Sequence, residues 1–239
     1  VLAKMNDDVS KSEALNQLNS EDEFEKYNAI KFLVSYQAKE ALKPILDVMK
    51  KSTLSENIAS EIPYLISLEE LLKDNLDDGV LVLSHIVNAI PEIIPPSAVL
   101  DYNLYNIFES LYHENLTSTS AILLRLAKDK FAELLSNEEY LFDCDKNTKD
   151  EVLAINNFLS KIDSNKLKSL LYDELFDESD FVFFAVDYVD EIEELEALLD
   201  SNNPTLILKV LSKLKEQKEQ DIEKVAFGIK GNKTDEIKE

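Results

Sequence analysis

The chain has 239 residues, is 45% hydrophobic and carries a net charge of −23. That length and apolar content are enough to bury a sizeable core. Its 25 basic residues include one arginine, Arg125. The positive surface and bidentate phosphate contacts of nucleic-acid-binding proteins are therefore missing, and an anionic membrane surface would repel the chain. We expect no nucleic-acid partner and no membrane partner.

Glycine and proline are scarce, at three and six residues, which is typical of long helices and not of β-sandwiches or barrels. Cys144 is the only cysteine, so no internal disulfide can form. No signal peptide is visible at the start, and no apolar run approaches the roughly 18 residues of a membrane span. These features predict a cytoplasmic protein.

Helix starts are marked by capping residues along the chain. In a capping box, a Ser or Thr and a Glu three residues later each satisfy the backbone N–H of the other. Asn203-Pro204 combines a capping side chain with proline at the first helical position, and Pro95-Pro96-Ser97 ends one helix and opens the next. The capping boxes that predict helix starts are Ser10/Glu13, Ser20/Glu23, Thr53/Glu56, Ser136/Glu139 and Thr148/Glu151.

Apolar residues recur at helical spacing between these starts. A tight turn around Tyr36–Ala38 joins the first two sets, which indicates two helices that fold back on each other. The segment Phe181–Val189 has the propensity of a strand, but we interpret it as a buried helix because an isolated strand would have no partner. The four apolar sets are Phe24, Tyr27, Ile30, Leu33 and Val34; Leu42, Ile45, Leu46 and Met49; Val152, Ile155, Phe158 and Leu159; and Ile207, Val210, Leu211 and Leu214.

Several stretches share one pattern: a polar turn, a helix with small or branched apolar residues, and a late leucine. They begin at Asn19, Asp145 and Asp200, with weaker copies near Asp74 and Glu114. Their spacing of about 30 to 50 residues is the range of helical solenoids.

Tyr27-Asn28-Ala29-Ile30 with Leu33, followed by Glu40-Ala41-Leu42-Lys43-Pro44-Ile45-Leu46, resembles a HEAT-type repeat. The aspartate and arginine that such repeats often carry between their two helices are absent, since the turn here is SYQAKE. The resemblance implies an α-solenoid that binds other macromolecules on a curved surface.

We therefore predict an all-α fold. In detail, it is a right-handed α-solenoid of antiparallel helix pairs with HEAT-like packing and about 11 to 13 helices. One solenoid domain would cover residues 1–228, and a frayed C-terminal tail would cover residues 229–239. The structural alternative is a compact, irregular helical bundle.

One stretch resembles a calcium-binding loop, with Asp143, Asp145 and Asn147 at the first three ligand positions. The loop needs Gly at its sixth position and a bidentate Glu at its twelfth, where this chain has Thr148 and Ala154. A polar turn between helices, with Thr148 capping the next helix, is the better interpretation.

Other chemical motifs are missing as well. His85 and His113 lack the spacing of metal ligands, so we interpret both as structural. Cys144 lies among acids, whose charge disfavours a thiolate nucleophile. None of the three glycines forms a phosphate-binding loop. We therefore expect no catalytic, cofactor-binding or metal-binding residues, and no cofactor.

Acidic residues are distributed unevenly. Residues 169–208 contain twelve acids and no Lys or Arg, and residues 74–124 also lack Lys and Arg. Like charges keep an apolar-rich protein soluble, which is the interpretation we favour. The sharper interpretation is a docking face for a basic protein. Its candidate residues are Asp187, Asp190, Glu191, Glu193, Glu194, Glu196 and Asp200.

The sequence therefore predicts a non-catalytic protein–protein interaction scaffold or adaptor whose partner is a protein, basic if the acidic face docks it. This prediction rests on analogy at the level of the fold. The alternative is an enzyme or small-ligand-binding protein with a carboxylate-lined pocket in the concave face. Converging, partly buried acids in a deep pocket would favour the alternative, and a shallow groove would favour the scaffold. The partner's identity and the oligomeric state stay open.

Overall fold

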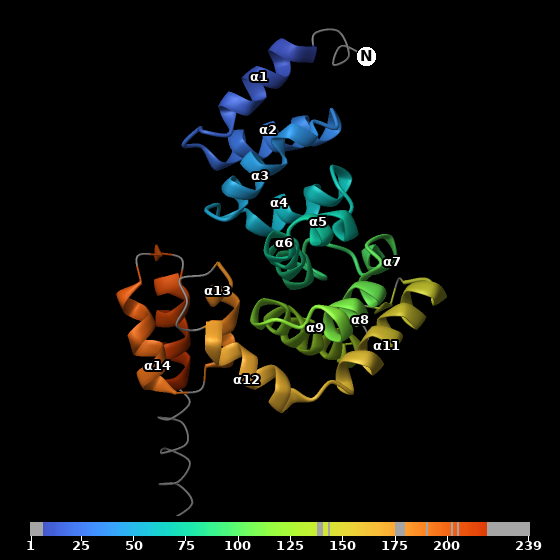
Figure 1. The fold of residues 1–239 in the computed structure, drawn as a ribbon, viewed down its shortest axis with the longest axis vertical. Coiled ribbons are helices and arrows are strands. Elements are labelled where there is room, and N and C mark those ends of the chain that lie inside the picture. The colour runs from blue at the N-terminus through green and yellow to red at the C-terminus, as the bar shows by residue number, and fades with distance from the viewer. Residues whose placement is uncertain are drawn as a thin grey trace, which may run out of the picture. The chain divides into compact units, whose positions relative to one another are not determined.

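The computed structural model describes residues 7–137, 141–142, 144–174, 180–189, 191–201, 203–204 and 206–218. Within these ranges the regular elements are all helical and no strand occurs, so the chain is all-α as predicted. The chain forms two compact units, unit 1 over residues 1–173 and unit 2 over residues 174–239 (Figure 1). The single domain over residues 1–228 stays a prediction, and the predicted tail at 229–239 lies outside the described residues.

Unit 1 begins with α1 (Asp7–Gln17), α2 (Glu23–Ser35), the 3-10 helix η2 (Lys39–Ala41) and α3 (Leu42–Met49). The predicted tight turn joins α2 to η2, and in it Gln37 takes a positive φ of 54°. The Gln37 side-chain amide donates to the carbonyl oxygens of Val34 at 3.3 Å and Tyr64 at 2.7 Å. These bonds hold the turn against η3 (Ile62–Tyr64). The predicted tight turn between two helices is confirmed, but α2 and α3 each pack on α4 (Ser55–Glu61) more than on each other, so their predicted pairing is not.

Aspartates cap two helices where the sequence analysis chose Ser or Thr. Asp22 caps α2 by accepting from the backbone N–H of Phe24 at 2.8 Å, so the predicted start at Ser20 is two residues early. Asp145 caps α11 (Lys146–Ser160), whereas Thr148 is buried in its first turn. An aspartate carboxylate both accepts these N–H groups and complements the positive end of the helix dipole.

The remaining helix starts were predicted with mixed success. Ser10 lies inside α1, and α4 (Ser55–Glu61) begins after Leu54 and not at Thr53. Ser136 is the last residue of α9 (Ser118–Ser136), so the predicted start there is wrong. Asn203 caps as predicted, because its side-chain oxygen accepts from the backbone N–H of Leu206 at 3.3 Å.

α5 (Leu68–Asp74) and α6 (Leu76–Asn88) share a single junction residue, Asn75. Its side-chain oxygen accepts from the backbone N–H of Asp78 at 3.3 Å and caps α6. α6 is buried on nearly all sides, with His85 the exception between Gly79 and Val87. Because α6 is buried along most of its length, it forms the centre of the core of unit 1 together with α9.

The helices of unit 1 pack on helices close to them in the chain (Figure 1). α2 contacts α4, α4 contacts α6, α6 contacts α9, and α9 contacts α11. α7 (Ala98–Asp101) and α8 (Leu104–Glu114) both contact α11, and α12 (Ser164–Glu174) follows it. Phe108 on α8 and Phe131 on α9 meet edge to face at 6.1 Å and join these two helices. Each helix therefore buries its apolar face against near neighbours in the sequence.

Unit 2 contains α13 (Val182–Ala185), η4 (Val186–Tyr188), α14 (Ile192–Ala197), η5 (Leu198–Asp200) and a helix over residues 206–218. The predicted buried helix at Phe181–Val189 is confirmed, because α13 and η4 fill this segment and most of its side chains are buried.

Most of the predicted apolar faces are buried, with two exceptions. Phe24 is 72% exposed because it lies in the first turn of α2, and Leu211 is 48% exposed on the helix over residues 206–218. Each helix buries a narrower stripe than the apolar spacing predicted.

Candidate functional site

The predicted acidic docking face lies in unit 2 and does not form one uniform surface. Asp190 lies outside the described residues. Glu194 is half-buried, and one of its carboxylate oxygens is enclosed without a hydrogen-bond partner. The exposed members are Asp187 in η4, Glu191 just before α14, Glu193 and Glu196 on α14, and Asp200 in η5.

Asp187 is held by lysines of the helix over residues 206–218. The Lys209 ammonium lies 2.6 Å from the Asp187 carboxylate and 4.1 Å from the centroid of the Phe183 ring. The Lys213 ammonium donates to the backbone carbonyls of Val186 at 2.7 Å and Asp187 at 2.5 Å. Asp187 therefore helps to pack this helix against η4, which is a structural role.

Glu193 and Glu196 are the clearest remaining docking candidates. They are three residues apart on α14, so they lie on the same side of the helix. Neither forms an ion pair with another described residue, and Glu191 precedes them in the same exposed segment. Exposed carboxylates of this kind can bind ammonium or guanidinium groups, and each such pair is worth about 0.2–1 kcal/mol.

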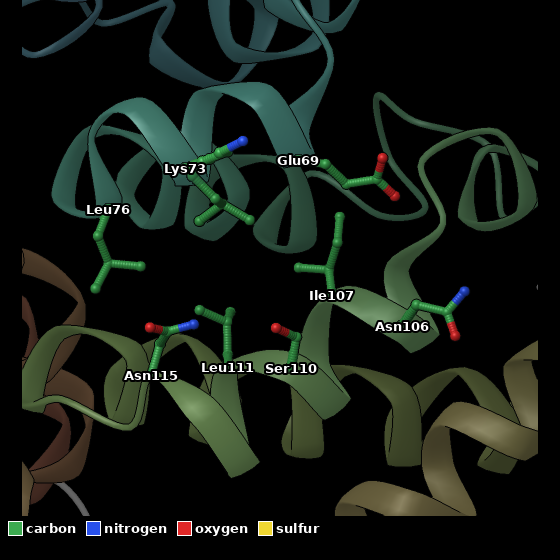
Figure 2. A pocket seen from close by; sticks show the side chains of 9 residues that line it. Glu69, Lys73, Leu76, Asn106, Ile107, Ser110, Leu111 and Asn115 are labelled. Atoms are coloured by element: carbon green, nitrogen blue, oxygen red, sulfur yellow. The ribbon is translucent and has the colours of Figure 1, made fainter.

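A hollow of about 590 Å³ opens in unit 1 between α5 and α8. Figure 2 shows Leu76 pointing into it toward Asn115 and Leu111, and Ile107 pointing from α8 toward α5. Ile107 and Leu111 are almost fully buried, whereas Leu72 of α5 and Leu76 at the start of α6 are half-buried. We call this hollow the α5–α8 slot. Its lining residues are Glu69, Leu72, Lys73, Leu76, Asn106, Ile107, Ser110, Leu111 and Asn115.

Polar groups lie along the edge of the α5–α8 slot. Asn106 and Ser110 lie four residues apart on α8, and Asn115 directly follows its end. Asn106 donates to the side-chain oxygen of Asn103 at 2.6 Å, and Ser110 donates to Glu114 at 3.2 Å. Among the described residues, the Asn115 side chain has no hydrogen-bond partner. It remains available to a ligand or partner.

Glu69 marks one end of the slot. The Asn103 side-chain amide donates to the Glu69 carboxylate at 2.6 Å and ties the start of α8 to α5. Asn103 has a positive φ of 53°, a conformation that Asn adopts more readily than most residues. A smaller hollow of about 190 Å³ adjoins and shares Glu69; Tyr102 also lines it.

Two tyrosines of unit 1 stay neutral at physiological pH. Burial raises the pKa of Tyr102 to about 12, and the neighbouring Tyr64, Asp101 and Glu61 add to the rise. Burial also raises the pKa of Tyr27 to about 12, helped by the hydrogen bond that its hydroxyl donates to Glu61 at 3.0 Å. Tyr102 thus presents a phenol to the smaller hollow and not a phenolate.

Gly79 explains how α5 and α6 lie so close together. A Cβ added at Gly79 would come within 2.9 Å of the Leu72 Cα and 2.8 Å of its Cδ2. The missing side chain at Gly79 therefore allows the two helices to approach. It also sets the position of Leu72, which lines the slot.

The chemical motifs weighed in the sequence do not come together into a metal site within the described ranges. No three His, Cys, Asp or Glu side chains there are placed to hold a metal ion. Asp143 lies outside these ranges, and Asp145 is the α11 cap. The hydrogen bond from the Thr148 backbone to Asp145, at 2.8 Å, lowers the pKa of this carboxyl. The exposed His113 ring packs against Tyr112, with centroids 5.0 Å apart.

The slot was missed by the sequence analysis because helix packing creates it. Its apolar members carry the same helical spacing as core residues, so nothing in their pattern separates them from the core. Two signals were available: Gly79 inside an apolar helix, and Asn75 as a cap where two helices meet without a loop. Both residues indicate that α5 and α6 approach each other closely.

Comparison of the chain with protein-family models, with curated proteins and with solved structures finds no match. No family is assigned, and the HEAT-type likeness of residues 27–46 stays a resemblance. None of the described helices combines the length and the hydrophobicity needed to cross a lipid bilayer.

Proposed function

We propose that this protein is a non-catalytic interaction module that docks a basic partner protein through exposed carboxylates. The observation that carries the proposal is that Glu191, Glu193 and Glu196 lie close together and exposed. All three are exposed and none is neutralised by a described basic residue, on a chain with a net charge of −23. A surface of this kind attracts a positively charged protein and steers its approach.

The packing of unit 1 supports the finer fold that this function was predicted to use. Helices that contact near neighbours in chain order are what an α-solenoid of HEAT-like pairs requires. We include that solenoid in the proposal. The role of this solenoid is to hold the surface helices of unit 1 in a fixed arrangement.

The rival function needs a pocket in which carboxylates converge to do acid–base chemistry. The α5–α8 slot has one carboxylate, Glu69, which already accepts a hydrogen bond from Asn103. The rest of its lining is apolar, amide, hydroxyl or lysine. This composition suits the contact surface of a binding protein better than an acid–base site.

A pull-down from source-cell lysate tests the proposal. The bait is the intact chain, compared with a variant carrying Glu191→Gln, Glu193→Gln and Glu196→Gln. The matched control carries Glu13→Gln, Glu21→Gln and Glu40→Gln, which are exposed acids of unit 1. Both variants change the net charge equally.

We expect a partner that the intact chain and the control retain at low salt. The α14 variant loses it, and high salt releases it because exposed charge pairs are screened. A partner that the α14 variant keeps, or the absence of any partner, contradicts the proposal.

A further inference from the structure

We infer that the α5–α8 slot receives the apolar side of an amphipathic, basic helix from a partner protein. This inference rests on the proposed function and assigns to it a second surface, in unit 1. The slot has an apolar floor, a polar edge and acidic surroundings, and each of these features narrows the choice of occupant.

The floor of the slot is built for apolar side chains. Leu76 points into the hollow toward Leu111, and Ile107 points into it from α8 (Figure 2). Leu72 and Leu76 are only half-buried. A hollow of about 590 Å³ has room for several side chains. Filling it would remove the exposed parts of Leu72 and Leu76 from water, which favours binding.

A helix fits the slot better than an extended peptide does. Extended peptides pair their backbone with the edge of a sheet or bind aromatic-lined grooves as polyproline II segments. The described residues contain no strand, and the slot lining contains no aromatic residue. A helix satisfies its own backbone and needs only a groove for residues at i, i+3, i+4 and i+7. Along α8, Asn106 to Glu114 spans about 12 Å at about 1.5 Å per residue, enough for about two helical turns of a partner.

The polar groups of the slot argue against a small polar ligand. Such ligands are fixed by polar groups that converge on them inside a pocket. Here the Lys73 amine points away from α8, and the Asn106 amide points outward (Figure 2). The Ser110 and Asn115 side chains do face the hollow, but Lys73 on the opposite side points away, so polar groups do not converge on its centre (Figure 2).

The surroundings of the slot select a basic partner. Residues 74–124, which include the whole α8 wall, contain seven acids and no Lys or Arg. Asp78 and Glu92 are paired with Lys50 and Lys130 from outside this stretch, which leaves five acids. Glu69 and Glu114 lie at the slot or beside it, and Lys73 is the one base among the lining residues. An incoming helix with Lys or Arg beside its apolar stripe meets complementary charge.

The test uses a random peptide library displayed on phage, selected on the full chain and on two variants. Ser110→Trp places a bulky ring at the edge of the slot. Ser169→Trp, at an exposed position of α12, is the matched control. Circular dichroism and thermal melting confirm that both variants remain folded. Peptides that are enriched are then synthesised, and their Kd values are measured by fluorescence anisotropy.

We expect the enriched peptides to be basic, with apolar residues at helical spacing. Ser110→Trp should weaken their binding at least about tenfold, because blocking a central apolar contact costs more than a rim contact. Ser169→Trp should leave it unchanged. An unenriched library, acidic or extended peptides, or equal binding by Ser110→Trp overturns the inference.

A charge change of known sign gives a second test. Lys73→Glu should strengthen the binding of the same peptides about two- to fivefold, the range of an exposed charge pair. Lys43→Glu on α3 makes the same change at an exposed residue that does not line the slot, and it should have a smaller effect. Weaker binding by Lys73→Glu contradicts a basic occupant.

The inference and the proposed function fail in different ways. If the intact chain captures a salt-sensitive partner that Ser110→Trp captures equally well, the function stands and the slot assignment is wrong. If no partner is captured but small organic fragments bind the intact chain and not Ser110→Trp in ligand-observed NMR, the slot is a small-molecule site and both fail.

Discussion

The α5–α8 slot of unit 1 and the acidic segment of unit 2 are both surfaces for a partner, but they arise differently. The acidic segment follows directly from the order of residues, with Glu191, Glu193 and Glu196 close in sequence and exposed. The slot exists only because α5 and α8, which are separated by residues 75–103, face each other across apolar side chains. A surface based on charge can thus be read from a sequence, whereas one based on shape requires the packing.

The prediction with the largest expected effect tests whether the two units unfold independently of each other. Phe108→Ala removes a fully buried ring that meets Phe131, and we expect unit 1 to lose about 3–5 kcal/mol of unfolding free energy. Hydrogen exchange read by mass spectrometry should show faster exchange in α8 and α9. Exchange in α14 should not change. An equal loss of protection from hydrogen exchange in α14 would show that the two units unfold together. The two surfaces could then not be treated as belonging to independent units.

A smaller effect tests the position of Leu72 in the slot. At an open helical site Gly→Ala stabilises by about 1 kcal/mol. At Gly79 the added Cβ meets the Leu72 backbone, so we expect Gly79→Ala to destabilise by about 1–3 kcal/mol. Urea unfolding measures the change, with Asn157→Ala at an exposed position of α11 as the control. A more stable Gly79→Ala variant would mean that α5 moves aside without cost.

A third prediction concerns the acidic segment, in which Asp187 stabilises the fold and Glu193 and Glu196 do not. A double-mutant cycle of Asp187→Asn and Lys209→Met should give a coupling of about 0.2–1 kcal/mol, since Asp187 is half-exposed and its charge is screened. Glu193→Gln with Glu196→Gln should change stability by less than about 0.5 kcal/mol. Thermal melts of the five proteins measure both values. A coupling of zero would return Asp187 to the docking candidates.

The smallest effect appears only at alkaline pH. The pKa of Tyr27 is raised to about 12 in the folded chain, against about 10 for an ordinary tyrosine. A raised pKa favours the neutral phenol in the folded state. Its stabilising contribution is therefore complete below about pH 10 and is lost as the pH rises towards 12. Tyrosinate absorbance should show late titration that Tyr27→Phe reduces; an unchanged titration curve would contradict it.

Apolar spacing predicted the helices well, because a helix in this chain must bury a stripe of apolar residues. Ile30, Leu33 and Val34 are buried as expected, and so is the segment that includes Phe184. Helix starts were less predictable, since a nearby carboxylate such as Asp22 competes for the same N–H groups as the predicted serine. The acidic candidates were found by counting charges, but only the packing shows that Lys209 holds Asp187.

The packing of unit 1 in chain order has a consequence for how the chain acquires its structure. Contacts between near neighbours in sequence close short loops, so little chain entropy is lost before a contact forms. Proteins with such low contact order fold quickly. The pairing of α1 with α2, and of α2 with α4, uses residues that are synthesised before α5 to α8. The N-terminal helices can therefore assemble while the ribosome is still adding the helices that complete the slot.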